Sequence, residues 1–232
     1  MIPSWLLHSR LIRFARRKLY ALSALNPGSI LARIQGTVLT FFSTKLHSAL
    51  PLQTPQMVFI DSTNFCNFSC RFCPTGDSEL LKSMDIPRGP MDFSLFRTVV
   101  EQLKAFPEKI PVLYLQAYGE PLLHENIAEM ISLAKQANVA HSVQLITNGS
   151  LLSKEKSITL LEAGLDLIII SVEHVTPEGY KELTGGFDDY ELIRDNTATL
   201  YREKVKRNNP LLVYAKILNV QLTGNQIGKF LN

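Results

Sequence analysis

Three cysteines, the only ones in the 232-residue chain, lie within eight positions of one another. They are Cys66, Cys70 and Cys73, in the spacing C-x3-C-x2-C. Three thiolates this close together can bind one metal centre, and ferredoxin-type iron–sulfur clusters normally take four protein thiolates. A cluster held by three would leave one iron without a protein ligand, and an open metal position is the usual mark of a metal site that does chemistry. The spacing therefore predicts a reactive metal centre.

Other uses of these cysteines fit the sequence less well. Isolated cysteines are most often buried as small apolar residues, but these stand among Asn67, Ser69 and Arg71 in a polar stretch. A structural zinc site needs a fourth cysteine or histidine at short spacing, and the nearest downstream histidine, His124, is far away. A disulfide would leave one thiol over, and nothing in the sequence indicates secretion. A cluster with an open iron is the favoured interpretation.

The cysteine segment, with the aromatic Phe72 just before the third cysteine, resembles the cluster loop of the radical S-adenosylmethionine (radical SAM) enzymes. The resemblance runs from about Met57 to about Gln221, because further motifs follow in the expected order. It implies a [4Fe-4S] cluster on the three cysteines, with the methionyl part of S-adenosylmethionine chelating the open iron. It also implies reductive cleavage of that cofactor to a 5′-deoxyadenosyl radical, which abstracts hydrogen from a substrate, and it places Phe72 near the adenine.

The segment Tyr118-Gly119-Glu120-Pro121 resembles the Gly-Gly-Glu-Pro motif of the family, with tyrosine in place of the first glycine. In the family this segment binds the amino group of the methionyl moiety. Gly119 permits close approach of the backbone, and exposed carbonyls and a carboxylate can accept hydrogen bonds from an ammonium group. A plain turn, in which glycine and proline are common, is the alternative.

Two further turns follow later strands. Thr147-Asn148-Gly149 resembles the family's T-N-G turn, where Asn148 can bond cofactor or substrate, although Asn-Gly is also a turn signal by itself. Ser171-Val172-Glu173-His174 stands where relatives commonly have Ser-x-Asp-Gly, whose serine contacts the methionyl carboxylate or the ribose. Glutamate and histidine replace aspartate and glycine, so the role of Glu173 stays open. His174 can touch substrate, although a lone loop histidine is more often a surface residue.

The predicted cofactor-binding residues are Phe72, Gly119, Glu120, Pro121, Asn148, Ser171 and Glu173, with Lys216 and Asn219 as weaker candidates.

Composition indicates a folded protein, with 46% hydrophobic and 19% charged residues. The net charge of +3 conceals an asymmetry, because residues 1–50 contain seven Lys or Arg and no carboxylate. Residues 51–232 contain 17 basic and 21 acidic residues, so this part is mildly acidic and we expect no nucleic-acid partner. No run of 18 apolar residues occurs, which predicts no membrane-spanning helix. A reducing cytoplasm fits free thiols and an oxygen-sensitive cluster.

The basic N-terminal region has two interpretations. Residues 4–24 predict an amphipathic helix, which can lie on an anionic membrane or bind a partner. The alternative is a helix that packs on the rest of the protein with its basic residues in solvent. Residues 30–50 predict a second helix. We therefore expect a basic helical extension at 1–50 and a radical SAM core domain at 51–232.

Strands alternate with helices from residue 57 onward, which predicts a parallel α/β sheet. Right-handed crossovers then place the C-terminal ends of all strands at one edge, where chemistry gathers in barrels of this kind. Residues 77–90 are expected to be an irregular insertion, and the Leu-Ile-Ile-Ile run of the fourth strand is expected to be covered on both faces. The strands are expected at 57–62, 112–116, 143–147, 167–172 and 211–219. The expected helix caps are Asp92 or Ser94, Ser153 and Thr176 at N-termini, and Asn138 at a C-terminus.

The resemblance implies a partial parallel (β/α) barrel of six βα units. Five strands precede Asn232, so the sixth unit is expected to be missing, together with the C-terminal auxiliary-cluster (SPASM-type) domain that one large branch of the family often carries. Members of that branch modify peptides, proteins or small molecules, and flavodoxin or ferredoxin is the implied electron donor. The alternative function is a non-catalytic iron–sulfur or electron-transfer module.

Overall fold

The computed structural model describes residues 51–85, 88–217 and 224 of the chain. The chain divides into two units, Met1–Leu52 and Gln53–Asn232, and the fold below is that of the second unit. The helices predicted at 4–24 and 30–50, and Asn219, lie outside the described residues. Among the described residues, none of the helices combines the length and the apolar character needed to cross a membrane.

Five parallel strands form one sheet, and each strand is hydrogen-bonded to its neighbours in the chain. Parallel neighbours need long crossover connections, and crossovers of one hand between sequential strands place their helices on the same face. This arrangement confirms the predicted α/β class with a parallel sheet that is curved like part of a barrel but not closed. The strands are β1 (Met57–Phe59), β2 (Ile110–Tyr114), β3 (Ala140–Thr147), β4 (Leu167–Val172) and β5 (Leu212–Ile217).

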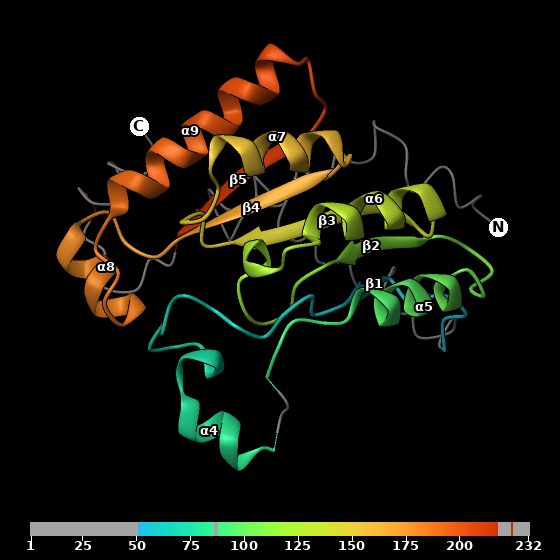
Figure 1. Cartoon of the computed structure of the whole chain (residues 1–232), viewed down its shortest axis with the longest axis horizontal. Helices are drawn as coiled ribbons and strands as arrows, with labels where there is room; N and C mark the ends of the chain where they lie inside the picture. The colour runs from blue at the N-terminus through green and yellow to red at the C-terminus, as the bar shows by residue number, and fades with distance from the viewer. Residues whose placement is uncertain (1–50, 86–87, 218–223, 225–232) are drawn as a thin grey trace, which may run out of the picture. The chain divides into compact units, whose positions relative to one another are not determined.

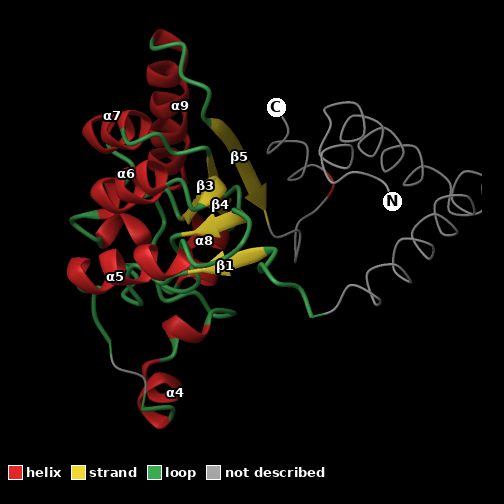
Figure 2. Cartoon of the chain, turned by 90° about the vertical axis from the view of Figure 1, so that its right-hand side faces the viewer, coloured by secondary structure: helices red, strands yellow, loops and turns green. Residues whose placement is uncertain are grey.

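The helices occupy three places. Four of them lie on one face of the sheet (Figure 2), namely α5 (Phe93–Leu103), α6 (Ile127–Ala137), α7 (Lys154–Glu162) and α9 (Tyr190–Lys206). The helix α8 (Pro177–Thr184) comes soon after the C-terminal end of β4. The short helix α4 (Ser78–Ser83) projects away from the sheet (Figure 1). Two 3-10 turns, η1 (Pro74–Gly76) and η2 (Pro121–Leu123), follow the cysteine segment and the Gly-Glu motif.

Side-chain caps define where the main helices begin and end. The Asp92 carboxylate accepts hydrogen bonds from the first turn of α5, and Ser153 does the same for α7. Thr176 caps α8, with Pro177 at the first helical position, where its missing N–H is not needed. Asn138 ends α6 in the left-handed conformation, with φ of 56°. These caps confirm the predicted boundaries.

Alternate residues along the strands face the helices and form the core. The covered face is apolar, and its residues include Leu113, Leu115, Val143, Leu145, Ile168 and Ile170. On the opposite face Phe59 is 52% exposed, and its ring stacks on Tyr114 with centroids 4.8 Å apart. In β4, Ile168 and Ile170 are fully buried, whereas Leu167 and Ile169 are partly buried, so the helix-covered face is the more completely buried of the two.

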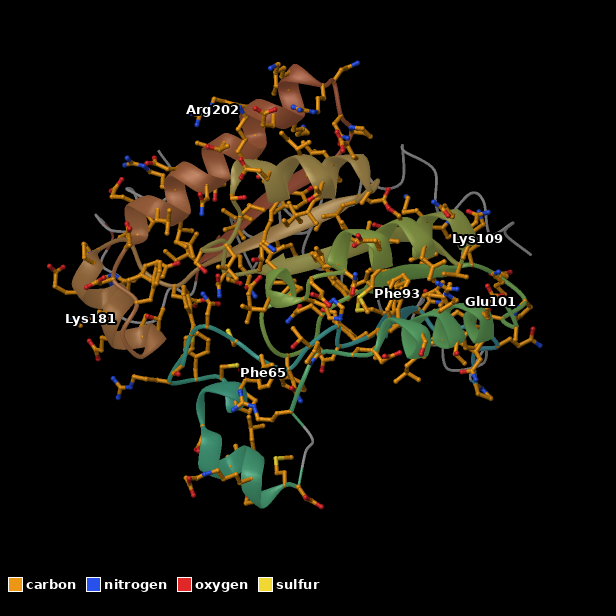
Figure 3. The ribbon with its side chains drawn as sticks, in the orientation of Figure 1. Phe65, Phe93, Glu101, Lys109, Lys181 and Arg202 are labelled. Carbon is orange, nitrogen blue, oxygen red and sulfur yellow. The ribbon has the colours of Figure 1, made fainter. Side chains whose placement is uncertain are left out.

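The insertion at 77–90 is more regular than predicted. It contains the helix α4, which was expected to be irregular chain. Asp77 accepts hydrogen bonds from the N–H groups of Glu79 and Leu80, and this N-cap stabilises a helix of six residues. Arg88, near the end of the insertion, lies with its guanidinium 5.2 Å from the ring centroid of Phe65. Phe65, which Figure 3 labels, lies in the loop that follows β1.

Candidate functional site

The cysteine segment leaves the sheet at the C-terminal end of β1 and is fixed by α8. The N–H groups of Ser69 and Arg71 donate to the carbonyls of Thr184 and Leu183, at 2.9 and 3.0 Å. These carbonyls belong to the last turn of α8, where helical partners are lacking. Phe68, between the first two cysteines, is only 4% exposed and packs against Phe187 with ring centroids 4.5 Å apart. The segment is therefore anchored on both its backbone and its one buried ring.

All three thiols are half-buried and free. Burial is the main cause that raises the pKa of Cys66, and the Glu120 carboxylate and Cys73 add to the effect. Burial also raises the pKa of Cys70 to about 12, with further contributions from Glu173 and the other two thiols. The charges of neighbouring thiols thus oppose the ionisation of Cys66 and Cys70. A positively charged metal centre would remove this opposition, because thiolates are stabilised by the metal that they bind.

The donor set fits the needs of an iron–sulfur cluster. Within the described ranges, no three Cys, His, Asp or Glu side chains converge closely enough to hold one metal ion. A [4Fe-4S] cluster offers separate iron atoms to its ligands, so its thiolates need not converge on one point. The sequence has three cysteines for four irons. Three half-buried thiols of one anchored loop fit a [4Fe-4S] cluster with one iron left open.

Polar groups lie next to two of the sulfurs. The N–H of Phe68 donates to Sγ of Cys66 at 3.4 Å, and Nδ2 of Asn148 lies 4.0 Å from the same sulfur. Oγ1 of Thr75 lies 2.9 Å from Sγ of Cys73. Such outer contacts orient metal ligands and tune the metal that they hold.

Glu120 is buried beneath the motif that follows β2. Its carboxylate is 1% exposed and accepts hydrogen bonds from the Leu122 N–H, the Thr147 hydroxyl and the Asn148 N–H, at 3.0, 2.6 and 2.8 Å. Burial raises the pKa of Glu120, although these three hydrogen bonds act against the shift. The carboxylate therefore joins the turn after β2 to the turn after β3 through three hydrogen bonds within the protein.

Asn148 connects the turn after β3 to the cysteine segment. Its Nδ2 donates to Oδ1 of Asn67 at 2.9 Å, and Nδ2 of Asn67 donates to Oγ of Ser150 at 2.8 Å. The N–H of Ser150 donates back to Oδ1 of Asn148 at 2.9 Å. The three side chains form a closed group, which we call the amide latch (Asn67, Asn148 and Ser150).

Gly119 has a steric requirement of its own. Its φ is +73°, and a Cβ at this position would collide with the carbonyl oxygen of Thr63 and lie 2.7 Å from that of Phe65. The next N–H, from Glu120, donates to the Phe65 carbonyl at 2.7 Å. Asp61 holds the start of the same turn by accepting from two successive N–H groups at 2.6 Å each. Gly119 thus allows the turn after β2 to lie against the chain that leads into the cysteine segment.

The end of β4 supplies a third group of predicted residues. Glu173 is 7% exposed, and burial raises its pKa while the charge of Lys216 lowers it. Ser171 is half-buried and lies opposite Lys216 in the β4–β5 ladder. His174 is buried at 7% exposure, not at the surface as a lone loop histidine usually is. Its Nδ1 accepts a hydrogen bond from the N–H of Thr176 at 3.1 Å. The ring therefore contacts the N-cap residue of α8.

The structure brings most of the predicted residues together. The carboxylates of Glu120 and Glu173 act electrostatically on Cys66 and Cys70, and Asn148 contacts both Glu120 and the cysteine segment. Phe72 is 52% exposed, and Pro121 is buried in η2. Neither these two nor Ser171 has a described contact with a cysteine side chain.

Sequence reasoning missed three residues that contact or brace the site, namely Asp61, Asn67 and Thr75. Thr75 follows the third cysteine and a proline, a pattern typical of a tight turn that could have drawn attention to it. Asp61 and Asn67 carry no such signal.

With this geometry in hand, comparison with known proteins defines the class. The sequence profile of the radical SAM superfamily matches residues 60–218, which is well over half of the chain. This chain belongs to the radical SAM superfamily.

Individual relatives agree with that assignment. The chain is 31% identical over 159 residues to a GTP 3′,8-cyclase of Limosilactobacillus fermentum. The aligned region covers 67% of this chain and 45% of the relative. The chain is 28% identical over 155 residues to a tungsten-containing aldehyde ferredoxin oxidoreductase cofactor-modifying protein of Pyrococcus furiosus, covering 66% of this chain and 41% of the relative. The chain thus spans less than half the length of these two relatives.

A solved structure shows the same fold. Streptococcus suis SuiB bound to S-adenosylmethionine superimposes with a TM-score of 0.56 at 16% identity, covering 89% of this chain and 41% of SuiB.

Proposed function

We propose that this chain is the catalytic core of a radical SAM enzyme, in which Cys66, Cys70 and Cys73 bind a [4Fe-4S] cluster. The observation that carries the proposal is the set of three half-buried thiols in one anchored loop at the C-terminal edge of the sheet. When bound, the cluster supplies one electron for cleavage of S-adenosylmethionine into methionine and a 5′-deoxyadenosyl radical, which takes hydrogen from a substrate. The substrate is a peptide, a protein or a small molecule.

The protein's own residues place the cofactors. Gly119 and Pro121 shape the turn that receives the methionyl amino group, and buried Glu120 holds this turn to the turn after β3. Asn148 holds the cysteine segment through the amide latch. Phe72 is exposed beside the cysteines, where its ring can cover an adenine. Ser171 and Glu173 face the same edge from β4 and offer polar contacts to the ribose or the methionyl group.

The direct test is turnover of the cofactor by the full chain. Protein loaded with iron and sulfide without oxygen, then reduced with dithionite, should convert S-adenosylmethionine to 5′-deoxyadenosine, measured by liquid chromatography. The Cys70→Ala variant should not. A parent protein that holds a cluster and forms no 5′-deoxyadenosine would contradict the proposal and favour an electron-transfer module instead.

We further propose that residues 1–50 are an extension of the core domain at 51–232, and that the protein works in the cytoplasm with flavodoxin or ferredoxin as its electron donor. Residues 4–24, which lie outside the described residues, contain closely spaced arginines and no carboxylate, which suits contact with an anionic membrane surface. Deleting residues 1–25 should then abolish sedimentation with vesicles that contain phosphatidylserine. Equal sedimentation of the deleted and full chains would contradict membrane contact.

A further inference from the structure

Thr75 places a hydroxyl group on one of the cysteine sulfurs. Its Oγ1 lies 2.9 Å from Sγ of Cys73, and the residue is only 8% exposed. Its hydroxyl forms no other described hydrogen bond. A buried hydroxyl nearly always has a partner, and here the partner is a cysteine of the proposed cluster.

The backbone around Thr75 fixes this contact. Thr75 is the middle residue of η1, and Pro74 at its first position has a restricted φ that suits the turn. The Gly76 N–H donates to the Cys73 carbonyl at 3.0 Å, which closes the turn. A Cβ at Gly76 would lie 2.7 Å from the carbonyl oxygen of Cys70. The turn can therefore lie this close to the cysteine segment only with glycine at position 76.

The direction of the hydrogen bond follows from the state of the sulfur. In the free protein either atom of this contact can be the donor. A cysteine that binds iron does so as a thiolate and has no proton to give. The Thr75 hydroxyl must then be the donor, and Cys73 the acceptor.

We propose that Thr75 is a positioning residue that sets the reduction potential of the cluster by donating this hydrogen bond to Cys73, an inference that rests on the proposed function. Adding one electron makes the cluster and its thiolates more negative, so a donor on a ligand sulfur stabilises the reduced form. Hydrogen bonds to the sulfurs are among the factors that set cluster potentials. The hydroxyl therefore raises the potential and makes the cluster easier to reduce.

The test compares Thr75→Val, which keeps the shape and removes the hydroxyl, with Thr75→Ser, which keeps the hydroxyl. Full-length proteins are loaded with cluster without oxygen, and the potential is measured by a redox titration followed by electron paramagnetic resonance. The valine variant should hold as much iron and sulfide as the parent and have a more negative midpoint potential. The serine variant should match the parent. The control variant is Thr98→Val. Thr98 is exposed, and its hydroxyl donates a hydrogen bond to the Ser94 carbonyl within α5. This variant should also match the parent.

A second readout detects the proton itself. Electron–nuclear double resonance after exchange into deuterium oxide should show an exchangeable proton coupled to the reduced cluster in the parent and in Thr75→Ser, and its loss in Thr75→Val. Equal potentials and equal proton couplings in the parent and Thr75→Val would overturn the inference.

Failure to load has its own meaning. If Thr75→Val and Thr75→Ala both fail to load while Thr75→Ser loads, the side chain is needed to build the loop, and the inference about the potential is wrong. A parent that forms no cluster would instead overturn the proposed function.

Discussion

The side-chain nitrogen of Asn148 lies 2.9 Å from Oδ1 of Asn67, although 81 positions separate the two residues in the chain. This contact closes the amide latch between the turn after β3 and the cysteine segment. Because the backbone N–H of Asn148 also donates to Glu120, the latch extends to the turn after β2. The hydrogen bonds of Asn148 therefore connect three loops at the C-terminal edge of the sheet.

Removing the latch should loosen the cysteine segment. Asn148→Ala removes the side-chain hydrogen bonds to Asn67 and Ser150. We therefore expect the cluster-free protein to lose about 1–3 kcal/mol of stability. Urea unfolding measures the loss, and iron content after anaerobic reconstitution should also fall. Asn126→Ala is the control, because Asn126 makes no side-chain cap bond at the start of α6. Unchanged stability and iron content in Asn148→Ala would show that the latch does not hold the segment.

Glu120 should be a structural support as well as part of a cofactor motif. Alanine at this position leaves three buried donors without an acceptor, so we expect a loss of at least about 3 kcal/mol on urea unfolding. Glu120→Gln, which keeps the shape but adds donor atoms, should lose less. If Glu120→Ala unfolds like the parent and only its affinity for S-adenosylmethionine falls, the carboxylate serves the cofactor and not the fold.

Two glycines give a matched test of the turn after β2. Gly119→Ala forces a Cβ into the carbonyl oxygen of Thr63 at a positive φ, and we expect a loss of more than about 2 kcal/mol together with poor cluster loading. Gly89→Ala meets nothing within 4 Å and should lie within about 0.5 kcal/mol of the parent. Similar stabilities for the two variants would mean that the turn does not lie against the cysteine segment as described.

Glu173 should make stability depend on pH. Burial raises its pKa, so the folded state holds the proton more tightly than the unfolded state does. The stabilisation by this proton is complete below the ordinary pKa of a glutamate and is lost as the pH rises through the raised value. Glutamine stays neutral at every pH, so the stability of Glu173→Gln relative to the parent should increase as the pH rises.

The measurement is the melting temperature of the cluster-free protein between pH 4 and pH 8. The difference, Glu173→Gln minus parent, should become more positive with increasing pH. Glu108→Gln, at an exposed loop position, is the control and should show a smaller trend. A difference that stays flat or becomes more negative would contradict a raised pKa.

Local patterns made much of the fold predictable. The β4 bounds agree with the prediction, because its apolar run follows a glycine and is ended by polar residues. Asn138 marked a helix end because asparagine tolerates the left-handed conformation, and Ser153 marked a helix start because its hydroxyl accepts a hydrogen bond from the first turn. The helix α4 was missed because six residues are too few to show a helical repeat of apolar side chains.

The candidate site was predictable only where a motif marks a turn after a strand. The cysteines, Glu120 and Asn148 belong to such motifs. Their partners do not, because Asn67 meets Asn148 only after β1 and β3 have entered the same sheet. The burial of Glu120 likewise follows from the packing of two turns, not from its own segment. The sequence therefore indicates the candidate residues of the site, and the fold shows which residues hold them in place.

The central claim is that Cys66, Cys70 and Cys73 hold a cluster with one iron open to S-adenosylmethionine. Electron paramagnetic resonance of the anaerobically reconstituted, dithionite-reduced protein, with and without S-adenosylmethionine, tests it most directly. We predict a reduced [4Fe-4S] signal that shifts when the cofactor is added and that is absent when all three cysteines are replaced by alanine. A signal that the cofactor leaves unchanged, or a cluster retained without the three cysteines, would contradict the claim.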